Sequence, residues 1–434
     1  MEWIFIVGRL LIFYFLREVE AFVFSVFLCD LKSDFMLSIY LFNPDYDMAM
    51  ANFTPYYKAP AEIMRMADDL SILPVWFAEK GDGVKVDSLE RVECFRCQLL
   101  ENCQDEGGKR SLHQLLSSVS WTEKWTSGYY RPWGWTPSLI HRLYMEGVDE
   151  RFYPSSADMQ RLRYLSSRQR CLEILPKFSG WEGICGEMKA CKQLCEVDDF
   201  IKERKQVILK APWSGSGRGL WKVSAESWNA QLAGWASRIL KVQGVLMAEP
   251  IYDKLADFAM EFFSDKEGNV SFVGYSFFET DVHGNYKANR LMSNVAIEGL
   301  LSRSVSLDLL RDVRSCLETS LKEMLGHAYQ GYLGVDMMIC RAEKGYQIHP
   351  CVEINLRMNM GVLSRILYDR YVHPLSEGEY VVEHYLCDGK ALLFHREMVE
   401  KYPLEWKDGK IARGYLSLTP VREDTRFQAY LLIG

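Results

Sequence analysis

The sequence has 434 residues, of which 48% are hydrophobic and 25% charged, and its 51 Lys and Arg against 58 Asp and Glu give a net charge of −7. This length accommodates two or three domains with a large core. The acidic balance disfavours a protein that binds nucleic acid through many phosphate contacts, so no nucleic-acid partner is expected.

The first 35 residues differ in composition from the rest of the chain. Two apolar runs, 3–16 and 22–29, fall short of the roughly 18–20 residues that a membrane helix needs. Met1-Glu2 lacks the positive start of a signal peptide. Because Met36 directly precedes a clean strand pattern, we interpret residues 1–35 as a non-native or dispensable extension. A membrane anchor and an ordered helix are the alternatives.

The 12 cysteines are scattered through expected core elements, which is typical of reduced thiols in a cytoplasmic protein. Two clusters, 94–103 and 185–195, lack the second CxxC or the pair of histidines that would complete a structural zinc site. The spacing therefore disfavours zinc.

A strand is predicted over residues 37–42, and it runs into Asn43-Pro44-Asp45-Tyr46-Asp47 before a helix. A strand that ends in such a turn is how α/β sheets build a ligand crevice. Asp45 and Asp47 either cap the helix or contact substrate.

The alternation of helix and strand continues with a helix at 60–70, a second strand at 73–78 and a helix at 112–119. It predicts a Rossmann-like α/β layer. The aromatic segment 121–137, rich in Trp, Pro and Gly, is either a packed cluster or the wall of a substrate pocket. Three further helices are expected, at 138–146, 156–165 and 166–175.

A short strand at 207–210 ends in Lys210 and leads into a glycine-rich turn. The turn comprises Ser214, Gly215, Ser216, Gly217, Arg218 and Gly219. Its backbone N–H groups would let a phosphate approach closely. The pattern is not GxxxxGK[ST], and a strand-like run at 220–223 follows instead of the helix of a dinucleotide fingerprint. We predict a glycine hairpin over phosphates, with a plain surface turn as the alternative.

Alternating segments then predict a sheet. Strands are expected at 245–252 and 270–278, and Asp257 and Glu261 lie on one face of the run between them. Residues 286–290 are interpreted as the end of a flexible loop.

The most informative stretch holds two alternating runs joined by Lys344-Gly345. If that pair forms a two-residue hairpin loop, Asp336 lies opposite Glu353, with Asn355 and Arg357 following on the same face. Opposed carboxylates repel, so we expect them to share a hard divalent cation such as Mg²⁺. Without a cation, removing the Glu353 charge should leave the protein at least as stable. A solvated face with an incidental Asp is the alternative.

Helices are predicted on both sides of this hairpin, an amphipathic one at 306–326 and another at 365–371. The tail returns in strands at 415–418 and 428–432. The sequence contains no internal repeat and no low-complexity linker.

Three signals now follow one another along the chain: Lys210 with its glycine-rich turn, the Glu249-Pro250 hinge before an acidic pair, and Asp336 before Glu-x-Asn-x-Arg. In this order the sequence resembles the ATP-grasp superfamily over residues 156–370. The resemblance implies an α/β and α+β architecture, in which an N-terminal Rossmann-like layer precedes a two-lobed ATP-grasp fold. The implied domains are 36–155, 156–370 and a set of C-terminal strands, 371–434, that pack on the grasp domain.

The resemblance also implies roles for individual residues. Lys210 and Ser214 to Gly219 would meet the nucleotide phosphates, while Asp336, Glu353 and Asn355 would bind magnesium. The nucleotide would further contact the hinge and the ribose-binding acid, namely Glu249, Pro250, Ile251, Tyr252 and Asp257. Arg357 and Arg290 would face the transferred phosphoryl group or the acyl-phosphate. Arg168 stands where a second phosphate-binding lysine is expected, and it is a departure from the pattern because arginine has a fork geometry.

By this resemblance the chain is an ATP-dependent ligase that joins a carboxylate to an amine through an acyl-phosphate and releases ADP and phosphate. ATP and Mg²⁺ or Mn²⁺ would be its cofactors. Small-molecule or peptide carboxylates and amines would be its substrates, in the cytoplasm and away from membranes, and a homodimer is compatible with this class. A phosphotransferase acting on an alcohol and a non-catalytic nucleotide-binding protein are the alternatives.

Overall fold

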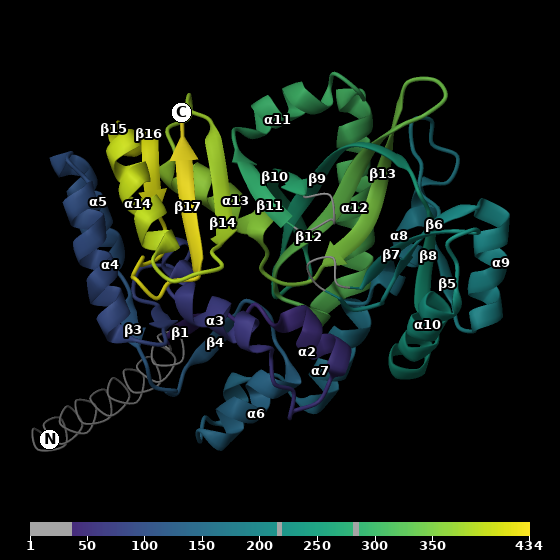
Figure 1. Cartoon of the computed structure of the whole chain (residues 1–434), viewed down its shortest axis with the longest axis horizontal. Helices are drawn as coiled ribbons and strands as arrows, with labels where there is room; N and C mark the ends of the chain where they lie inside the picture. Colours follow the sequence, from purple (N-terminus) through teal and green to yellow (C-terminus); the bar gives the residue numbers. More distant parts are fainter. Residues whose placement is uncertain (1–36, 215–218, 281–285) are drawn as a thin grey trace, which may run out of the picture.

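The computed structural model describes residues 37–214, 219–280 and 286–434, so the predicted extension 1–35 lies outside the described residues. Three β-sheets organise the chain: a four-stranded parallel sheet, a nine-stranded sheet and a second four-stranded sheet. The nine-stranded sheet spans the middle of the molecule, with the teal small sheet at one end and the purple and blue N-terminal layer below (Figure 1). Within the described ranges, no helix is long and apolar enough to cross a membrane.

The N-terminal layer is α/β, as predicted. Its strands follow the order β3-β2-β1-β4, and neighbouring strands are parallel. The strands are β1 (Ser38–Leu41), β2 (Gly83–Lys85), β3 (Ser120–Thr122) and β4 (Tyr129–Pro132). The helices of this part are α2 (Tyr46–Asn52), α3 (Ala61–Asp69), α4 (Leu89–Asn102), α5 (Glu106–Ser117), α6 (Pro137–Met145) and α7 (Ser156–Leu165). Parallel pairing places the carboxyl ends of β1 and β4 at one edge, where ligands bind in such sheets.

The predicted strand at 73–78 is wrong. Leu73–Trp76 forms a short 3₁₀ helix, and the second strand is β2. A short, fully buried apolar run looks the same in either structure by periodicity, and Pro74 has no N–H to donate to a strand neighbour. The Trp76 indole N–H donates to the carbonyl of Leu418 at 2.8 Å, so this helix anchors the layer to the C-terminal strands.

The small antiparallel sheet contains the predicted hairpin around the glycine-rich turn. Strand β6 pairs with β7 from Gln206–Ser224 to Lys210–Leu220, and with β8 on its other side. The strands are β5 (Lys189–Cys191), β6 (Gln206–Lys210), β7 (Leu220–Ser224) and β8 (Leu246–Pro250), covered by α9 (Leu194–Arg204) and α10 (Ala230–Gln243). Their apolar side chains form a core of their own, which makes this sheet a separate lobe.

The nine-stranded sheet has the order β13-β12-β9-β10-β11-β14-β17-β16-β15, and its neighbours are antiparallel. Its strands are β9 (Asp253–Ser264), β10 (Val270–Thr280), β11 (Tyr286–Leu291), β12 (Gly331–Arg341), β13 (Tyr346–Asn355), β14 (Gly378–His384), β15 (Glu405–Lys407), β16 (Lys410–Ser417) and β17 (Phe427–Ile433). The interpretation of 286–290 as a loop is therefore wrong. Pairing with β10 and β14 makes it a strand, although its polar sequence does not alternate. The predicted C-terminal strands are confirmed, and they continue this same sheet.

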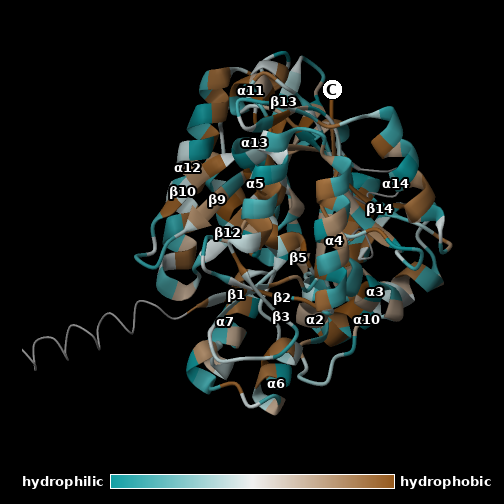
Figure 2. Cartoon of the chain, turned by 90° about the vertical axis from the view of Figure 1, so that its left-hand side faces the viewer, coloured by the Kyte–Doolittle hydropathy of each residue, from teal (hydrophilic) through white to brown (hydrophobic). Residues whose placement is uncertain are grey.

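Helices cover the sheet on both faces. They are α8 (Cys171–Ile174), α11 (Asn294–Leu301), α12 (Leu307–Leu325), α13 (Met360–Tyr371) and α14 (Lys390–Lys401). The predicted helix at 306–326 is confirmed as α12, which buries Leu310, Val313, Leu317 and Leu321. Turned to its left-hand side, the molecule shows outer helices such as α4 and α14 with mixed teal and brown surfaces, as expected of amphipathic helices (Figure 2).

The register of the β12–β13 hairpin confirms the predicted pairing of Asp336 with Glu353, but the loop and the register differ from those predicted. Asp336 does lie opposite Glu353, but Arg341 pairs with Tyr346, so the loop is longer than two residues. A register shift between Asp336 and Met338 restores the predicted pair. Such a bulge re-aims the side chains beyond it.

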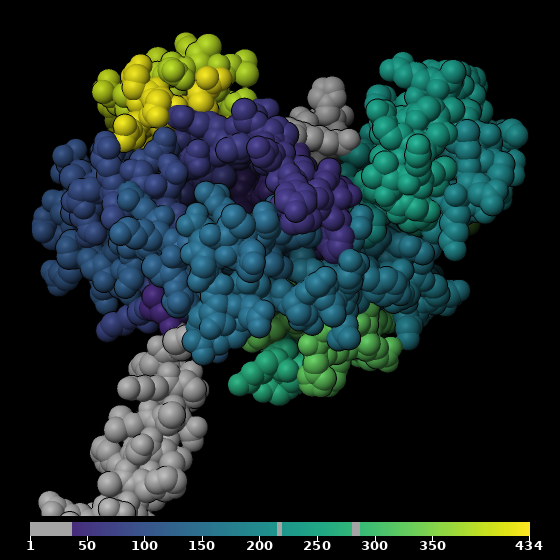
Figure 3. All heavy atoms as spheres, turned by 90° about the horizontal axis from the view of Figure 1, so that it is seen from below, coloured from purple at the N-terminus to yellow at the C-terminus, as the bar shows by residue number. Residues whose placement is uncertain are grey.

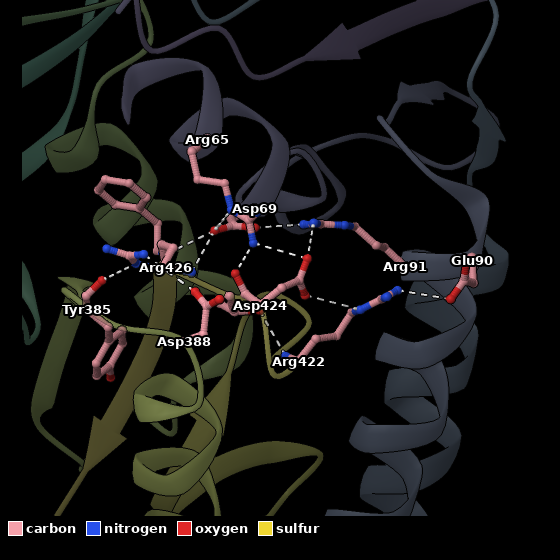
Figure 4. Close-up of polar contacts among 11 residues, drawn as sticks. Arg65, Asp69, Glu90, Arg91, Tyr385, Asp388, Arg422, Asp424 and Arg426 are labelled. Carbon is pink, nitrogen blue, oxygen red and sulfur yellow. Dashed lines mark hydrogen bonds and ion pairs between the residues drawn. The ribbon is translucent and has the colours of Figure 1, made fainter. Parts of the chain in front are cut away.

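A buried carboxylate ties the N-terminal layer to the C-terminal strands. Asp69, 1% exposed, accepts hydrogen bonds from Arg65 Nε at 3.0 Å, Arg91 Nη1 at 2.7 Å, and the backbone N–H groups of Arg426 at 2.9 Å and Phe427 at 3.1 Å. Figure 4 shows these arginines converging on Asp69, with neighbouring carboxylates completing the cluster. A cavity of about 340 Å³ lies beside it. Both oxygens of the Asp69 carboxylate have hydrogen-bond partners, so we interpret the cluster as a structural contact that holds the N-terminal layer against the C-terminal strands.

Candidate active site

The two antiparallel sheets meet along the outer edge of the hairpin. Ile184 forms a parallel bridge with Ile348, and Cys185 N–H donates to the Ile348 carbonyl at 2.9 Å. The same segment continues into β5, which pairs with β8 of the small sheet. This connection fixes β6 and β8 beside the hairpin that carries the opposed carboxylates.

Lys210 and Glu249 form a buried ion pair in the small sheet. Lys210 Nζ lies 2.7 Å from Glu249 Oε2, and the two residues are 5% and 1% exposed. Burial raises the pKa of Glu249, and the Lys210 charge opposes that rise. Glu249 Oε1 is buried and has no partner among the described residues. An unpaired buried carboxylate oxygen is costly, so this atom is available to a ligand.

Arg168 bridges the small sheet and the hairpin. It lies on a short 3₁₀ helix, Arg168–Arg170, and is 5% exposed. Its Nη1 donates to the carbonyl of Ala211 and to Ser214 Oγ, both at 2.7 Å. Its Nη2 donates to the Ser214 carbonyl at 3.0 Å and to Glu353 Oε2 at 2.8 Å. This residue therefore contacts both the segment after β6 and a predicted magnesium ligand.

The predicted magnesium ligands share one face of the hairpin. Asp336 opposes Glu353, and Gly334 opposes Asn355. Burial, and then the Glu353 charge, raise the pKa of Asp336 well above its ordinary value, while a hydrogen bond from Asn355 lowers it. Two carboxylates and an amide oxygen are donors that Mg²⁺ accepts, so the residues fit this ion. Among the described residues, no group of three or more His, Cys, Asp or Glu side chains forms a metal site.

Arg357 is held by the N-terminal layer. Its Nε and Nη2 donate to Asp47 Oδ1 at 3.1 Å and Oδ2 at 2.7 Å. The Tyr46 hydroxyl donates to the Leu356 carbonyl at 3.4 Å. Asp45 occupies the N-cap position of α2 but makes no capping hydrogen bond with its side chain. The acidic turn thus docks the end of the hairpin, and capping by Asp45 is not what the structure shows.

The Trp-rich segment packs against the same end of the hairpin. Trp133 is 6% exposed and meets Phe42 edge to face at 4.9 Å between ring centroids. Its carbonyl accepts a hydrogen bond from Met358 N–H at 3.0 Å. Seen from below, purple residues of the N-terminal layer lie between its blue part and the teal lobe (Figure 3). The packed-cluster interpretation of Trp133 is thereby favoured.

Arg290 is not brought to this site. It lies opposite Phe277, which lies opposite Phe258, which lies opposite Met337. Directly opposed residues share a face, and successive residues alternate, so Arg290 is on the opposite face of the sheet from Asp336. The expectation that Arg290 faces a transferred phosphoryl group is therefore corrected. The sequence did not reveal that its segment is a strand, and the strand pairing decides its face.

The remaining residues that were predicted to contact the nucleotide lie at different distances from the hairpin carboxylates along the strands. Asp257 forms an ion pair with Lys254 and opposes Met338, two residues from Asp336 along β12. The Tyr252 ring lies 5.4 Å from His349, just after β8 ends at Pro250, and Ile251 is exposed. Gly219 approaches Ser214 so closely that a Cβ would lie 2.4 Å from the Ser214 side chain. Gly215, Ser216, Gly217 and Arg218 lie outside the described residues.

Two buried residues beside the site received no role from the sequence. Glu261, 1% exposed, accepts from Ser276 Oγ at 2.8 Å and Asn359 Nδ2 at 3.1 Å, and burial raises its pKa to about 7. His349 is fully buried, neither ring nitrogen has a partner among the described residues, and burial lowers its pKa to about 3. The signal in the sequence that could have identified Glu261 and His349 was a polar residue within each of two largely apolar strands.

Comparison with known proteins gives structural likeness without sequence likeness. No protein-family model and no curated protein matches the sequence. An ADP complex of N5-carboxyaminoimidazole ribonucleotide synthetase is similar with a TM-score of 0.47 and 10% identity, over 92% of each chain. The biotin carboxylase domain of Hydrogenobacter thermophilus 2-oxoglutarate carboxylase, with MgADP and bicarbonate, has a TM-score of 0.46 and 12% identity over 79% of this chain and 84% of that one. The Staphylococcus aureus N5-carboxyaminoimidazole synthetase, with ADP, has a TM-score of 0.43 and 11% identity over 92% and 93%.

Both kinds of neighbour are ATP-grasp proteins, the superfamily that the sequence resembles. At TM-scores below 0.5 this likeness decides neither the reaction nor the role of any residue. Those assignments depend on the contacts within this chain.

Proposed function

We propose that this chain is an ADP-forming, ATP-dependent ligase that joins a carboxylate to an amine through an acyl-phosphate, in the cytoplasm. The observation that supports it best is the hairpin pair Asp336 and Glu353, one of which contacts Arg168 at the junction of the two antiparallel sheets. The proposed domains remain 36–155, 156–370 and 371–434.

The nucleotide would lie between the two sheets. Glu249 Oε1 is buried and unpartnered at the end of β8, where a purine or ribose group would complete its hydrogen bonds. Lys210 would meet the phosphates, with Ser214 to Gly219 above them. Asp257 and the backbone of Ile251 and Tyr252 would contact the nucleoside.

Asp336, Glu353 and Asn355 would hold Mg²⁺ or Mn²⁺, which supplies positive charge against the phosphate oxygens when bound. The work of the protein side chains is position and charge. The γ-phosphoryl group passes to the substrate carboxylate, and the amine then attacks the acyl carbon and releases phosphate. Lys210 and Arg357 would offset the negative charge of these groups, and no side-chain nucleophile is needed.

Arg357 would act at the boundary with the N-terminal layer. Its bidentate pair with Asp47 fixes the guanidinium beside the hairpin end, so substrate carboxylate and Asp47 would share one cation. This contact gives the Asn43 to Asp47 turn a positioning role next to the substrate.

A screen for ADP release tests the proposal. Amino acids and small peptides are supplied singly and in pairs with ATP and Mg²⁺, and ADP is measured with and without an amine. Amine-dependent release is expected. Release that needs a hydroxyl acceptor and no amine would instead identify a phosphotransferase, and tight ATP binding with no product would identify a nucleotide-binding protein without turnover.

A further inference from the structure

Arg168 has a geometry that a phosphate-binding lysine could not reproduce. Its two terminal nitrogens make four hydrogen bonds, three to Ala211 and Ser214 and one to Glu353. The backbone N–H of Arg168 also donates to the Pro212 carbonyl at 3.1 Å. A lysine ammonium is a single point of charge, whereas a planar guanidinium spans several acceptors at once. The arginine found here is therefore suited to bridging.

The bridge ends on a carboxylate that has a like-charged neighbour. Glu353, whose side chain is 24% exposed, lies opposite Asp336. In the described parts of the chain, no Lys or Arg forms an ion pair with Asp336, and Arg168 is the cation that contacts Glu353. The buried Arg168 guanidinium thus pairs directly with the negative face on which the cofactor metal is proposed to bind, while the Arg357 charge acts on it from the hairpin end without an ion pair.

We propose that Arg168 is the counter-ion of Glu353 in the nucleotide-free protein and must release that carboxylate before it can bind a divalent cation. Arg168 is then a positioning residue that sets the affinity of the hairpin for metal. The inference rests on the proposed magnesium role of Asp336 and Glu353. It assigns Arg168 a function other than direct phosphate binding.

On this proposal, loss of the buried Arg168 charge should strengthen metal binding. Removing the positive charge beside Glu353 leaves two carboxylates without an ion-pair partner, and they attract a cation more strongly. A residue that merely supported the fold would weaken metal binding when removed. The direction of the change therefore separates the two roles.

The test measures binding of Mn²⁺ alone to the full-length, metal-stripped protein without nucleotide, by electron paramagnetic resonance of the free ion. Arg168→Gln should bind Mn²⁺ at least about tenfold more tightly than the unmodified protein. Arg168→Lys keeps the charge and should stay within about threefold. Arg170→Lys is the matched control, because Arg170 lies on the same short helix, is also 5% exposed and pairs with Glu173 away from the site.

Melting curves provide a second readout, because a metal that binds the folded protein raises its melting temperature. The melting temperature of Arg168→Gln should rise more with Mn²⁺ than that of the unmodified protein, and adding Glu353→Gln should abolish the extra rise. Mn²⁺ binding by Arg168→Gln that is unchanged or weaker overturns the proposal.

Failure of the proposed function would look different. Tighter Mn²⁺ binding in Arg168→Gln with no binding of ADP to any variant would leave the counter-ion role standing and remove the ligase. Normal binding of ADP with Mn²⁺ affinity unaltered by Arg168→Gln would do the reverse.

Discussion

Glu353→Gln and Asp336→Asn should change the stability of the ligand-free protein in opposite directions, although the two carboxylates face each other. Glu353 is ion-paired at 2.8 Å to Arg168, whose side chain is 5% exposed. Gln removes the charge and leaves the buried guanidinium without its counter-ion. Asp336 has no such partner among the described residues, and burial together with the Glu353 charge raises its pKa.

The magnitudes follow from this asymmetry. Breaking a buried ion pair costs about 3–5 kcal/mol, but Glu353 is 24% exposed and Gln still accepts a hydrogen bond. We therefore expect Glu353→Gln to lose about 1–3 kcal/mol, the range of a charge-assisted hydrogen bond. Asp336→Asn removes an opposed like charge and should gain up to about 1 kcal/mol.

The gain from Asp336→Asn should also depend on pH. Since the pKa of Asp336 in the folded protein is raised above its ordinary value of 3.8, the fold loses stability as pH rises from 3.8 towards the raised pKa. The Asn variant should match the unmodified protein below pH 3.8 and exceed it near neutrality. Thermal and urea melts in EDTA without nucleotide measure both effects. A Glu353→Gln protein that is as stable as the unmodified one, or more so, would show that Arg168 does not depend on Glu353 as its counter-ion.

Three further predictions concern buried charges. Lys210→Ala should weaken nucleotide binding by about 1.5–3 kcal/mol in titration calorimetry. It should also lower the melting temperature, because Glu249 is left buried without its ion-pair partner. Adding Glu249→Gln should restore the melting temperature but not the nucleotide affinity. Asp69→Asn should lower the free energy of unfolding by about 3–5 kcal/mol in urea melts, because Arg65 and Arg91 lose a fully buried partner. Glu93→Gln, which removes an exposed ion pair with Arg96, should change the free energy of unfolding little. Glu261→Gln should equal the unmodified protein below pH 4.5 and grow more stable than it between pH 4.5 and about 7, because burial raises the pKa of Glu261 to about 7 in the folded protein; above that pH the difference should stay constant. A constant difference across melts from pH 4 to pH 8 would contradict this.

Local patterns in the sequence were sufficient to predict much of the fold. The alternation around Lys344-Gly345 was sufficient to oppose Asp336 and Glu353, although a bulge and a longer loop produce that pair. Strand β6 and the following hairpin were also readable from a short apolar run and glycines.

Pairings between distant segments were not readable. Asp47 and Arg357 are 310 residues apart, so no local pattern indicates their bidentate contact. Arg168 reaches Glu353 across 185 residues, and this contact reverses the expectation that removing the Glu353 charge leaves the protein at least as stable. Arg290 was misplaced for the same reason, since its face depends on pairing with β10.

The most direct test of a magnesium–nucleotide site between the two antiparallel sheets is calorimetric titration of the chain with ADP, in Mg²⁺ and in EDTA, for the unmodified protein and for Asp336→Asn with Glu353→Gln. We expect binding that requires Mg²⁺ and is lost in the double variant, while Arg170→Lys binds normally. Binding of equal strength in EDTA and in the double variant would exclude such a site, because the hairpin carboxylates would then have no part in holding the nucleotide.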